Sequence, residues 1–372
     1  MILFEPVALG GLKLRNRIMM SPMSQRAAGE DGRAGDWHLV HYGSRAVGGC
    51  GLVMIEDTAV AALGRTGRSA LGLYERGQVE PLRRIACFCH EQGAAVGLQI
   101  AHAGRRALAD THGAPGIVSA SPIPYAPGWQ PPRQAQADDL AGLVAAFAAA
   151  ASLAVQAGID VLEIHAAHGY LLHQFLSPLT NRRDDDYGVD PRGRRRLLLE
   201  VVGAVRDRWP APRPLFVRLP AADGFAGGLQ PAEVVDCASE CVRCGADLID
   251  LTGGTPVPGG RGPEPEQILA TAHELVAAYS PDACGPAAGG ARVLEATVPR
   301  ALAAAPALAL GGGVESALAA AELIERHGAT LVSVGRPLLE DPYWPLHIAR
   351  RDDADRAQAS APKGPRAAIG AA

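Results

Sequence analysis

The chain has 372 residues, of which 48% are hydrophobic and 20% are charged, so it can bury one large core or two smaller ones. Its formal net charge of −4 argues against a nucleic-acid scaffold, because such proteins carry an excess of Lys and Arg. After Met1 there is no basic stretch followed by a long apolar core, and no uninterrupted apolar run reaches the length of a membrane span. We therefore expect a cytoplasmic protein with neither nucleic acid nor membrane as a partner.

Eight short apolar runs that resemble buried strands recur along the chain, and helical patterns lie between most of them. The runs cover residues 18–21, 51–56, 95–100, 159–164, 215–219, 247–252, 307–310 and 330–334. The clearest helical patterns cover residues 79–92, 137–157, 194–209, 231–244 and 315–327. This alternation predicts an α/β fold, a (β/α)8 TIM barrel. An open dinucleotide-binding sheet is disfavoured because no G-x-G-x-x-G follows the first run.

Two strand-end loops are unusually long for a compact domain. Residues 101–138 are rich in Pro and Gly and are expected to fold over the barrel mouth, and residues 253–298 contain a helical pattern at 264–279. Loops of this length are usually lids or binding segments. Residues 1–350 are therefore interpreted as one TIM-barrel domain, and the small and polar residues of 351–372 predict a disordered tail.

The residues richest in chemistry follow the fourth run, in the sequence His165-Ala-Ala-His-Gly-Tyr170. Active sites of this fold lie at the carboxyl ends of the strands. There the imidazoles of His165 and His168 can both donate to one oxygen, and the phenol of Tyr170 can deliver a proton. This set suits a substrate with a polarised carbonyl. Satisfied core histidines are the ordinary alternative.

A metal site is a second alternative for the same segment. His165, His168 and His173 are possible nitrogen ligands, with Asp184 to Asp186 nearby in the sequence. Zinc sites usually show tighter ligand patterns than this one. The three cysteines within 237–244 share one face of a predicted helix and have no fourth ligand at a suitable spacing. We therefore expect no metal.

Other strand ends carry residues suited to a flat ligand with a phosphate. Gln99 and Arg218 would point toward the barrel axis, where an amide and a guanidinium can bind the polar edge of a heterocycle. A buried ion pair is the alternative for Arg218. Glycines 311–313 follow the seventh run, and Gly335-Arg336 follow the eighth. Loops at these two places of a barrel commonly bind phosphate, because glycines let backbone N–H groups approach an anion.

With these motifs the chain resembles the Old Yellow Enzyme family of FMN-dependent ene-reductases, and it is most similar to the family's thermophilic-like subgroup. The resemblance extends over most of the chain. It is carried by Leu14-Arg-Asn-Arg-Ile18, Ser21-Pro-Met23, His102-Ala-Gly-Arg105, His165-Ala-Ala-His-Gly-Tyr170, Phe175-Leu-Ser-Pro178, Asn181-Arg182, Asp186-Tyr-Gly188, Phe216-Val-Arg218 and Val334-Gly-Arg336.

The resemblance implies an FMN cofactor, NAD(P)H as co-substrate, and roles for individual residues. His165 and His168 resemble the pair that holds the substrate oxygen, and Tyr170 resembles the proton donor. Gln99 and Arg218 resemble the ligands of the flavin ring. The remaining cofactor positions are the segment against the flavin and the phosphate site, which correspond to Ser21, Pro22, Met23 and Ser24, and to Gly312, Gly335 and Arg336.

Three positions depart from the pattern of that subgroup. Ser24 stands where the subgroup usually has Cys, and its hydroxyl can still hydrogen-bond the flavin. Arg26 stands where an aromatic Tyr lines the substrate pocket, so it is a candidate substrate-binding residue. Asp57 stands where a small residue usually lies beside the flavin, which makes it a candidate cofactor-binding residue.

The function that the resemblance implies is reduction of the activated C=C bond of α,β-unsaturated carbonyl or nitro compounds with NAD(P)H as hydride source. A specialised biosynthetic flavoenzyme of the same fold, working in desaturation, isomerisation or dienoyl-type reduction, is the main alternative. A phosphate-binding lyase or aldolase barrel without flavin is less expected, because such barrels commonly use a Schiff-base lysine and the chain has only Lys13 and Lys363. The expected partners are a small-molecule substrate and, in a homo-oligomer, further copies of this chain.

Overall fold

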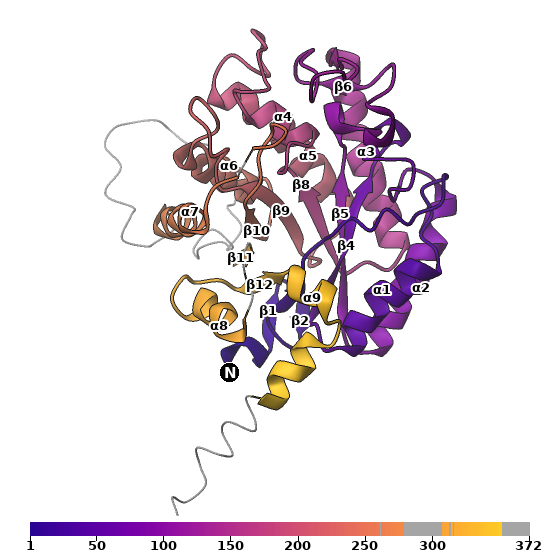
Figure 1. Cartoon of the computed structure of the whole chain (residues 1–372), viewed down its shortest axis with the longest axis vertical. Helices are drawn as coiled ribbons and strands as arrows, with labels where there is room; N and C mark the ends of the chain where they lie inside the picture. Colours follow the sequence, from indigo (N-terminus) through magenta and orange to yellow (C-terminus); the bar gives the residue numbers. More distant parts are fainter. Residues whose placement is uncertain (261, 279–306, 312–313, 315, 352–372) are drawn as a thin grey trace, which may run out of the picture.

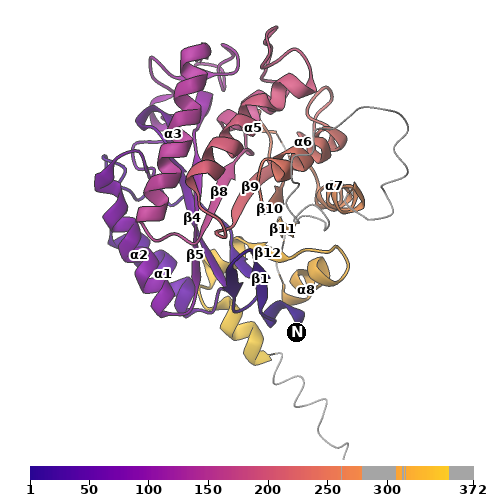
Figure 2. The same cartoon turned by 180° about the vertical axis from the view of Figure 1, so that it is seen from behind.

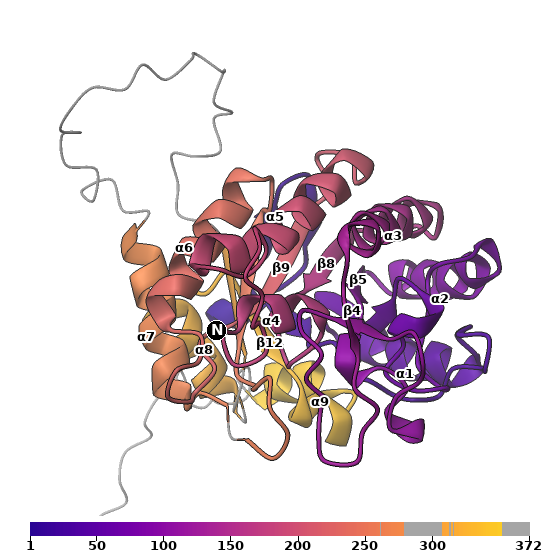
Figure 3. The same ribbon diagram turned by 90° about the horizontal axis from the view of Figure 1, so that it is seen from above.

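The computed structural model describes residues 1–260, 262–278, 307–311, 314 and 316–351. Within this part of the chain, eight parallel strands close into a barrel in the order β10-β11-β12-β3-β4-β5-β8-β9. Helices pack on the outside of the strands (Figures 1 and 2), and the view from above shows them arranged around the barrel (Figure 3). The predicted TIM barrel is confirmed.

Each predicted apolar run corresponds to one barrel strand. The strands are β3 (Ile18–Met20), β4 (Leu52–Ala59), β5 (Ala95–Ala101), β8 (Val161–His165), β9 (Leu215–Pro220), β10 (Leu248–Thr252), β11 (Ala307–Gly311) and β12 (Leu331–Val334). The helices are α1 (Asp36–Val47), α2 (Val79–Glu91), α3 (Ala137–Gln156), α4 (Leu171–Leu176), α5 (Pro191–Arg208), α6 (Pro231–Arg243), α7 (Pro265–Ala278), α8 (Ala317–Glu325) and α9 (Arg336–Glu340). Helix α1 lies outside the helical patterns predicted above.

The inside of the barrel is built in layers, because alternate residues of each strand point to its axis. An apolar layer fills the amino-terminal half and includes Met19, Leu52, Val161, Phe216 and Leu248. Two residues further along β8, β9 and β10, the same face carries a polar layer of charged side chains. These are Glu163, Arg218 and Asp250, all buried. A charged layer directly above an apolar one marks the end of the barrel at which a polar ligand can be held.

The amino-terminal end of the barrel is closed by a hairpin of β1 (Val7–Leu9) and β2 (Leu12–Leu14). Leu9 and Leu14 join the inner apolar cluster of the barrel, and the turn between them donates a hydrogen bond from Gly11 N to Pro212 O. Figure 1 shows this hairpin at the lower end of the strands. Access to the barrel interior therefore comes from the opposite, carboxyl end.

Helix α3 has the length and hydropathy of a membrane span by composition alone, with a mean hydropathy of 1.6 over its best window. The sequence prediction that no apolar run is long enough is therefore too strict. The helix packs against α5 in the outer layer of the barrel and buries Leu143, Phe147 and Ala150. These buried residues form the apolar stripe that a helix of a globular protein must bury.

The first long connection folds over the barrel mouth, as predicted. It contains the short strands β6 (Val118–Ser119) and β7 (Arg133–Gln134) and reaches the loop that follows β10 through a 2.6 Å hydrogen bond from Arg105 to Pro256 O. The helical pattern in the second connection is confirmed as α7. Beyond residue 278 this connection lies outside the described residues, and so does the predicted tail except for Arg351.

Candidate active site

Side chains that follow β3 and β12 meet beside the polar layer at the carboxyl end of the barrel. Ser21 N donates to Val334 O at 2.9 Å, which joins the two segments, and the Ser21 hydroxyl lies 3.4 Å from the Arg218 guanidinium. A Cβ atom built on Gly335 would lie 3.4 Å from Met23 Sδ, so the glycine permits a close approach. The structure thus brings together Ser21, Met23, Arg218 and Gly335, all predicted for the flavin.

The polar layer forms the floor of this site. Arg218 Nε lies 3.1 Å from Asp250 Oδ2, an ion pair inside the barrel, and the amide of Gln99 donates to Glu163 Oε1 at 2.7 Å. Burial raises the pKa of Glu163 to about 8, with the neighbouring Asp250 as a second cause, and burial also raises the pKa of Asp250. Both predicted ring ligands, Gln99 and Arg218, are therefore held by a carboxyl group on the neighbouring strand. The ion-pair alternative for Arg218 is part of the same arrangement.

Above the floor, His165 and His168 form a directed chain of hydrogen bonds. Ala167 N donates to His165 Nδ1 at 3.3 Å, so the proton of this imidazole is on Nε2. His165 Nε2 lies 3.2 Å from His168 Nδ1, which assigns the second proton to His168 Nε2, 3.4 Å from the Thr252 hydroxyl. Burial, and then nearby positive groups, lower the pKa of both imidazoles well below the usual value. Both are therefore neutral and present Nε2–H groups.

Tyr170 lies against this pair. Its ring meets that of His165 edge to face, with centroids 4.8 Å apart. Burial raises the pKa of the phenol, so it carries its proton at neutral pH. The Arg106 guanidinium lies 5.0 Å from the Tyr170 ring centroid and donates to His168 O. The sequence patterns do not identify Arg106, because only the fold brings the first long connection onto the catalytic segment.

A third group of side chains lies at the rim, where Ser24 donates a very short hydrogen bond to Asp57 Oδ1. Burial raises the pKa of Asp57 to about 7. The negative charge of Asp57 and the positive charge of Arg26 both act on Tyr170, which places the two residues near the phenol. Arg26 itself is exposed and has a positive φ of 53°. Two of the three departures from the family pattern, Ser24 and Asp57, thus form one cluster with Tyr170.

Both ring nitrogens of His173 have protein partners, and the residue supports the segment between His168 and Tyr170. Its Nδ1 accepts from Gly169 N at 2.9 Å, and its Nε2 donates to Asp223 Oδ1 at 2.8 Å. The Ser177 hydroxyl donates to the other oxygen of Asp223 at 2.5 Å. Among the described residues there is no cluster of His, Cys, Asp or Glu that could hold a metal ion, and the Asp185 and Asp186 side chains pair with arginines.

The residues of the site fit FMN in their chemistry. Arg218 is buried, and within the described part of the chain its Nη2 makes only long contacts, of 3.2 Å to Thr252 and 3.4 Å to Ser21. This cation therefore keeps capacity for a stronger acceptor on a flavin ring. Gln99 is buried beside it. Gly335 and Arg336 lie at the start of α9, where a phosphate was predicted. Gly312, the remaining member of the predicted phosphate site, lies outside the described residues.

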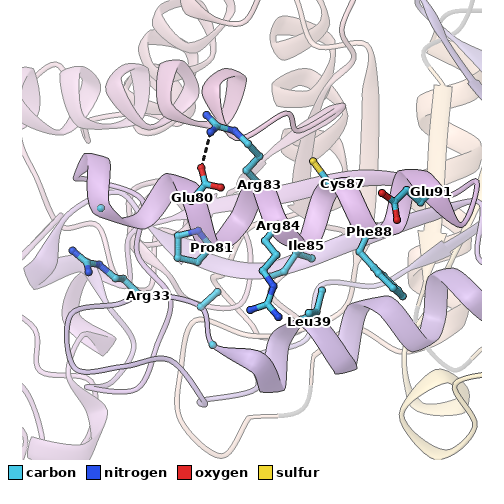
Figure 4. Close-up of a pocket in the computed structure, with 13 residues that line it drawn as sticks. Arg33, Leu39, Glu80, Pro81, Arg83, Arg84, Ile85, Cys87, Phe88 and Glu91 are labelled. Carbon is cyan, nitrogen blue, oxygen red and sulfur yellow. Dashed lines mark hydrogen bonds and ion pairs between the residues drawn. The ribbon is translucent and has the colours of Figure 1, made fainter.

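A groove lies elsewhere on the molecule, between α1 and α2. Its volume is about 840 Å³, and its lining includes Arg33, Leu39, Glu80 and Phe88 (Figure 4). The lining does not include His165, His168 or Tyr170. This groove is on the outer, helical surface of the barrel and is separate from the strand-end site.

A strand-end site with a buried guanidinium, two neutral imidazoles and a phenol in a TIM barrel has the chemistry expected of an oxidoreductase that holds a flavin. Residues 2–255 match the model of the NADH:flavin oxidoreductase / NADH oxidase family. An NADPH dehydrogenase of Geobacillus sp. (strain WCH70) is 38% identical over 357 residues, which cover 94% of each chain. The chain therefore belongs to the NADH:flavin oxidoreductase family, which is the Old Yellow Enzyme family. It is an oxidoreductase that uses FMN and NAD(P)H.

Solved structures agree with this assignment. Morphinone reductase superposes with a TM-score of 0.74 at 26% identity, covering 91% of this chain and 87% of its own. A 2-naphthoyl-CoA reductase superposes with a TM-score of 0.80 at 23% identity and covers 94% of this chain. This chain spans about half of that reductase, 52% of its length, so the likeness concerns the barrel fold.

Proposed function

We propose that the protein reduces the activated C=C bond of α,β-unsaturated carbonyl or nitro compounds, with NAD(P)H as the source of the hydride. One observation carries the proposal: two neutral imidazoles and a protonated phenol are in mutual contact at the mouth of the barrel, above a buried guanidinium. FMN, when bound, supplies hydride transfer, and the side chains supply binding, orientation and the proton.

His165 and His168 bind the oxygen of the substrate in this proposal. Their Nε2–H groups make long hydrogen bonds, to His168 Nδ1 at 3.2 Å and to the Thr252 hydroxyl at 3.4 Å, and His168 also interacts with the backbone of Gly253. A carbonyl or nitro oxygen that accepts from both groups replaces two poor hydrogen bonds by two better ones. Negative charge builds on this oxygen as the β-carbon accepts hydride, so both bonds strengthen in the transition state. This polarisation is what makes the C=C bond reactive.

Tyr170 delivers the proton to the α-carbon. Its raised pKa keeps the phenol protonated, and the contact with His165 places it beside the group that binds the substrate oxygen. The Arg106 guanidinium over the ring favours the negative charge that the phenol acquires when the proton leaves. Proton delivery by a positioned side chain typically contributes about 10²–10⁴-fold in rate.

The proposal is tested with His165→Ala and His168→Ala, with 2-cyclohexenone and a nitroalkene as acceptors. Loss of one donor is expected to lower turnover of these acceptors roughly 10²–10³-fold. Each rate is divided by the rate of ferricyanide reduction by the same variant, which removes any effect on NADPH oxidation or FMN content. If this ratio is unchanged in both variants, the two imidazoles do not bind the acceptor and the proposal is wrong.

A further inference from the structure

Asp57 is a buried acid at the rim of the site that the mechanism above leaves unused. It is 7% exposed and lies in β4, within the irregular stretch of the pairing with β5 between Ile55 and Thr58. Its two carboxyl oxygens contact different segments. Oδ1 accepts from Ser24, which follows β3, and Oδ2 lies 3.5 Å from the Thr66 hydroxyl. The carboxyl group is therefore directed to the side of the barrel mouth where the flavin segment lies.

Ser24 connects this carboxyl group to the proposed proton donor. The Ser24 hydroxyl donates to Asp57, and it also acts on the phenol of Tyr170, whose pKa it lowers. A hydroxyl has one hydrogen to donate and can accept at the same time, so it can pass a proton between two groups. Thr66 contacts Asp57 alone at a longer distance, which makes it a natural control.

The charged groups around Asp57 come from several elements. Glu56 precedes it in β4 and, after burial, is a further cause of its raised pKa. The Glu56 carboxylate is itself occupied, because Oε1 accepts from Tyr42 and Oε2 accepts from Gln25 N at 2.6 Å. Across the site, Arg26 and Arg106 act on Tyr170. Asp57 is thus an acid without a cationic partner among the groups that set its pKa.

We propose that Asp57 is the proton store of the active site and that it recharges Tyr170 through the Ser24 hydroxyl. The inference rests on the proposed function, since it takes Tyr170 as the proton donor. When Tyr170 gives its proton to the α-carbon of the substrate, the phenolate accepts the hydrogen of Ser24. Ser24 accepts the proton of the Asp57 carboxyl group in the same event. No electrons move along this path, and the carboxylate of Asp57 takes up one proton from solvent to restore the starting state.

The path explains why a buried acid is useful beside a phenol of raised pKa. With Asp57 protonated, proton transfer to the substrate ends with a neutral Tyr170 and a carboxylate. With Asp57 ionised, the same step would leave a phenolate beside a carboxylate, which like-charge repulsion disfavours. Reduction of the acceptor is therefore expected to slow as the pH rises through about 7, the pKa of Asp57.

The experiment compares Asp57→Asn, Ser24→Ala and Thr66→Val in the FMN-loaded protein. The reduced enzyme is mixed with 2-cyclohexenone in a stopped-flow instrument across the pH range, and FMN reduction by NADPH is measured separately. We expect wild type and Thr66→Val to share the inflection near pH 7. Asp57→Asn and Ser24→Ala should lose the inflection, and below it their acceptor half-reaction should be slowed roughly 10²-fold.

A second readout does not depend on turnover. The infrared difference spectrum between the acid and alkaline sides of pH 7 should contain a carboxyl band that is missing in Asp57→Asn but present in Ser24→Ala and Thr66→Val. If Asp57→Asn keeps both the band and the inflection, Asp57 does not titrate in this range and the proposal is overturned. It is also overturned if Thr66→Val behaves as Ser24→Ala does, because the effect then comes from the environment of Asp57 and not from a path to Tyr170.

A Tyr170→Phe variant distinguishes a failure of the proton-store proposal from a failure of the proposed reductase function. A Tyr170→Phe variant that loses enone reduction while Asp57→Asn retains the wild-type pH profile overturns the proton store and leaves the reductase intact. Tyr170→Phe with undiminished enone reduction contradicts the assigned proton donor, and it overturns the proton store as well.

Discussion

Two buried aspartates at the carboxyl end of the same barrel differ in how completely they are hydrogen-bonded. Asp223 accepts from His173, Ser177 and Leu229 N, at 2.8, 2.5 and 2.8 Å. Burial acts to raise its pKa, but these hydrogen bonds prevail, and the pKa is lowered. Asp57 accepts one short bond from Ser24 and one long contact from Thr66, and burial raises its pKa to about 7.

The difference shows what each acid does for the protein. A carboxylate with its acceptor sites filled is fixed in its charged form and holds backbone in place, here the segment around Gly169 through His173. A carboxylate with few donors stays close to its protonated form and can exchange a proton. Stability and chemistry are thus assigned to different aspartates.

The pH dependence of stability should have opposite signs for the two acids, and the larger effect belongs to Asp57. Its folded pKa of about 7 lies above the ordinary 3.8, so its contribution to stability is present below about 3.8 and is lost as the pH rises to 7. A shift of this size corresponds to about 4 kcal/mol. Asp57→Asn should therefore be more stable than wild type at pH 8, and the gain should vanish near pH 4.

Urea unfolding of the FMN-free protein at a series of pH values measures this gain. Thr66→Val is the matched control, because it removes a weak contact to the same carboxyl group and should shift the unfolding free energy by well under about 1 kcal/mol. A gain for Asp57→Asn that is constant from pH 4 to pH 8 would show that the carboxyl group has an ordinary pKa in the folded protein.

Substitution of Asp223 should lower the free energy of unfolding instead. In Asp223→Asn the amide oxygen can still accept from His173, but the NH2 group meets the Ser177 hydroxyl and Leu229 N, which are donors. Two buried donors lose their acceptor, at a cost of about 1–3 kcal/mol each. Because the folded pKa of Asp223 is lowered, the wild-type advantage should be present above the ordinary pKa of 3.8 and shrink as the pH falls below it.

Asp223→Asn should also slow enone reduction, since His173 then holds Gly169 less firmly between His168 and Tyr170. The same urea titrations, with enone turnover as a second measurement, test both parts. A variant as stable as wild type at pH 7 would mean that the Asp223 network contributes nothing to the fold.

The sequence predicts most of the barrel and the centre of the site, because both depend on local patterns. The eight strands follow from short apolar runs, and His165, His168 and Tyr170 lie within six residues of one strand end. The floor of the site also leaves a signal, since Glu163 and Asp250 interrupt apolar strands at positions that face the barrel axis. That signal requires knowing that the strands close into a barrel.

Contacts between distant segments are what the sequence patterns do not predict. Ser24 meets Asp57 across 33 positions, His173 meets Asp223 across 50, and Arg106 meets His168 across 62. Each contact depends on where a loop comes to rest after the barrel has closed. The departures at Ser24 and Asp57 can be recognised singly in the sequence, but only the fold makes them partners.

Arg106 and Asp57 carry opposite charges, and both act on the phenol of Tyr170. Substitution of Arg106 is expected to have a smaller effect than substitution of either aspartate. Its guanidinium lies 5.0 Å from the Tyr170 ring centroid and 4.9 Å from that of Tyr125, and it lowers the pKa of the phenol that Asp57 raises. Arg106→Met should therefore make Tyr170 a weaker acid and reduce kcat/KM for an enone about 10-fold, equivalent to about 1.4 kcal/mol. Arg106→Lys keeps the positive charge and should recover part of the loss. If Arg106→Met and Arg106→Lys reduce kcat/KM equally, the planar guanidinium and its hydrogen bond to His168 O matter, and the positive charge does not. The proposed opposition between the charges of Arg106 and Asp57 at Tyr170 is then wrong.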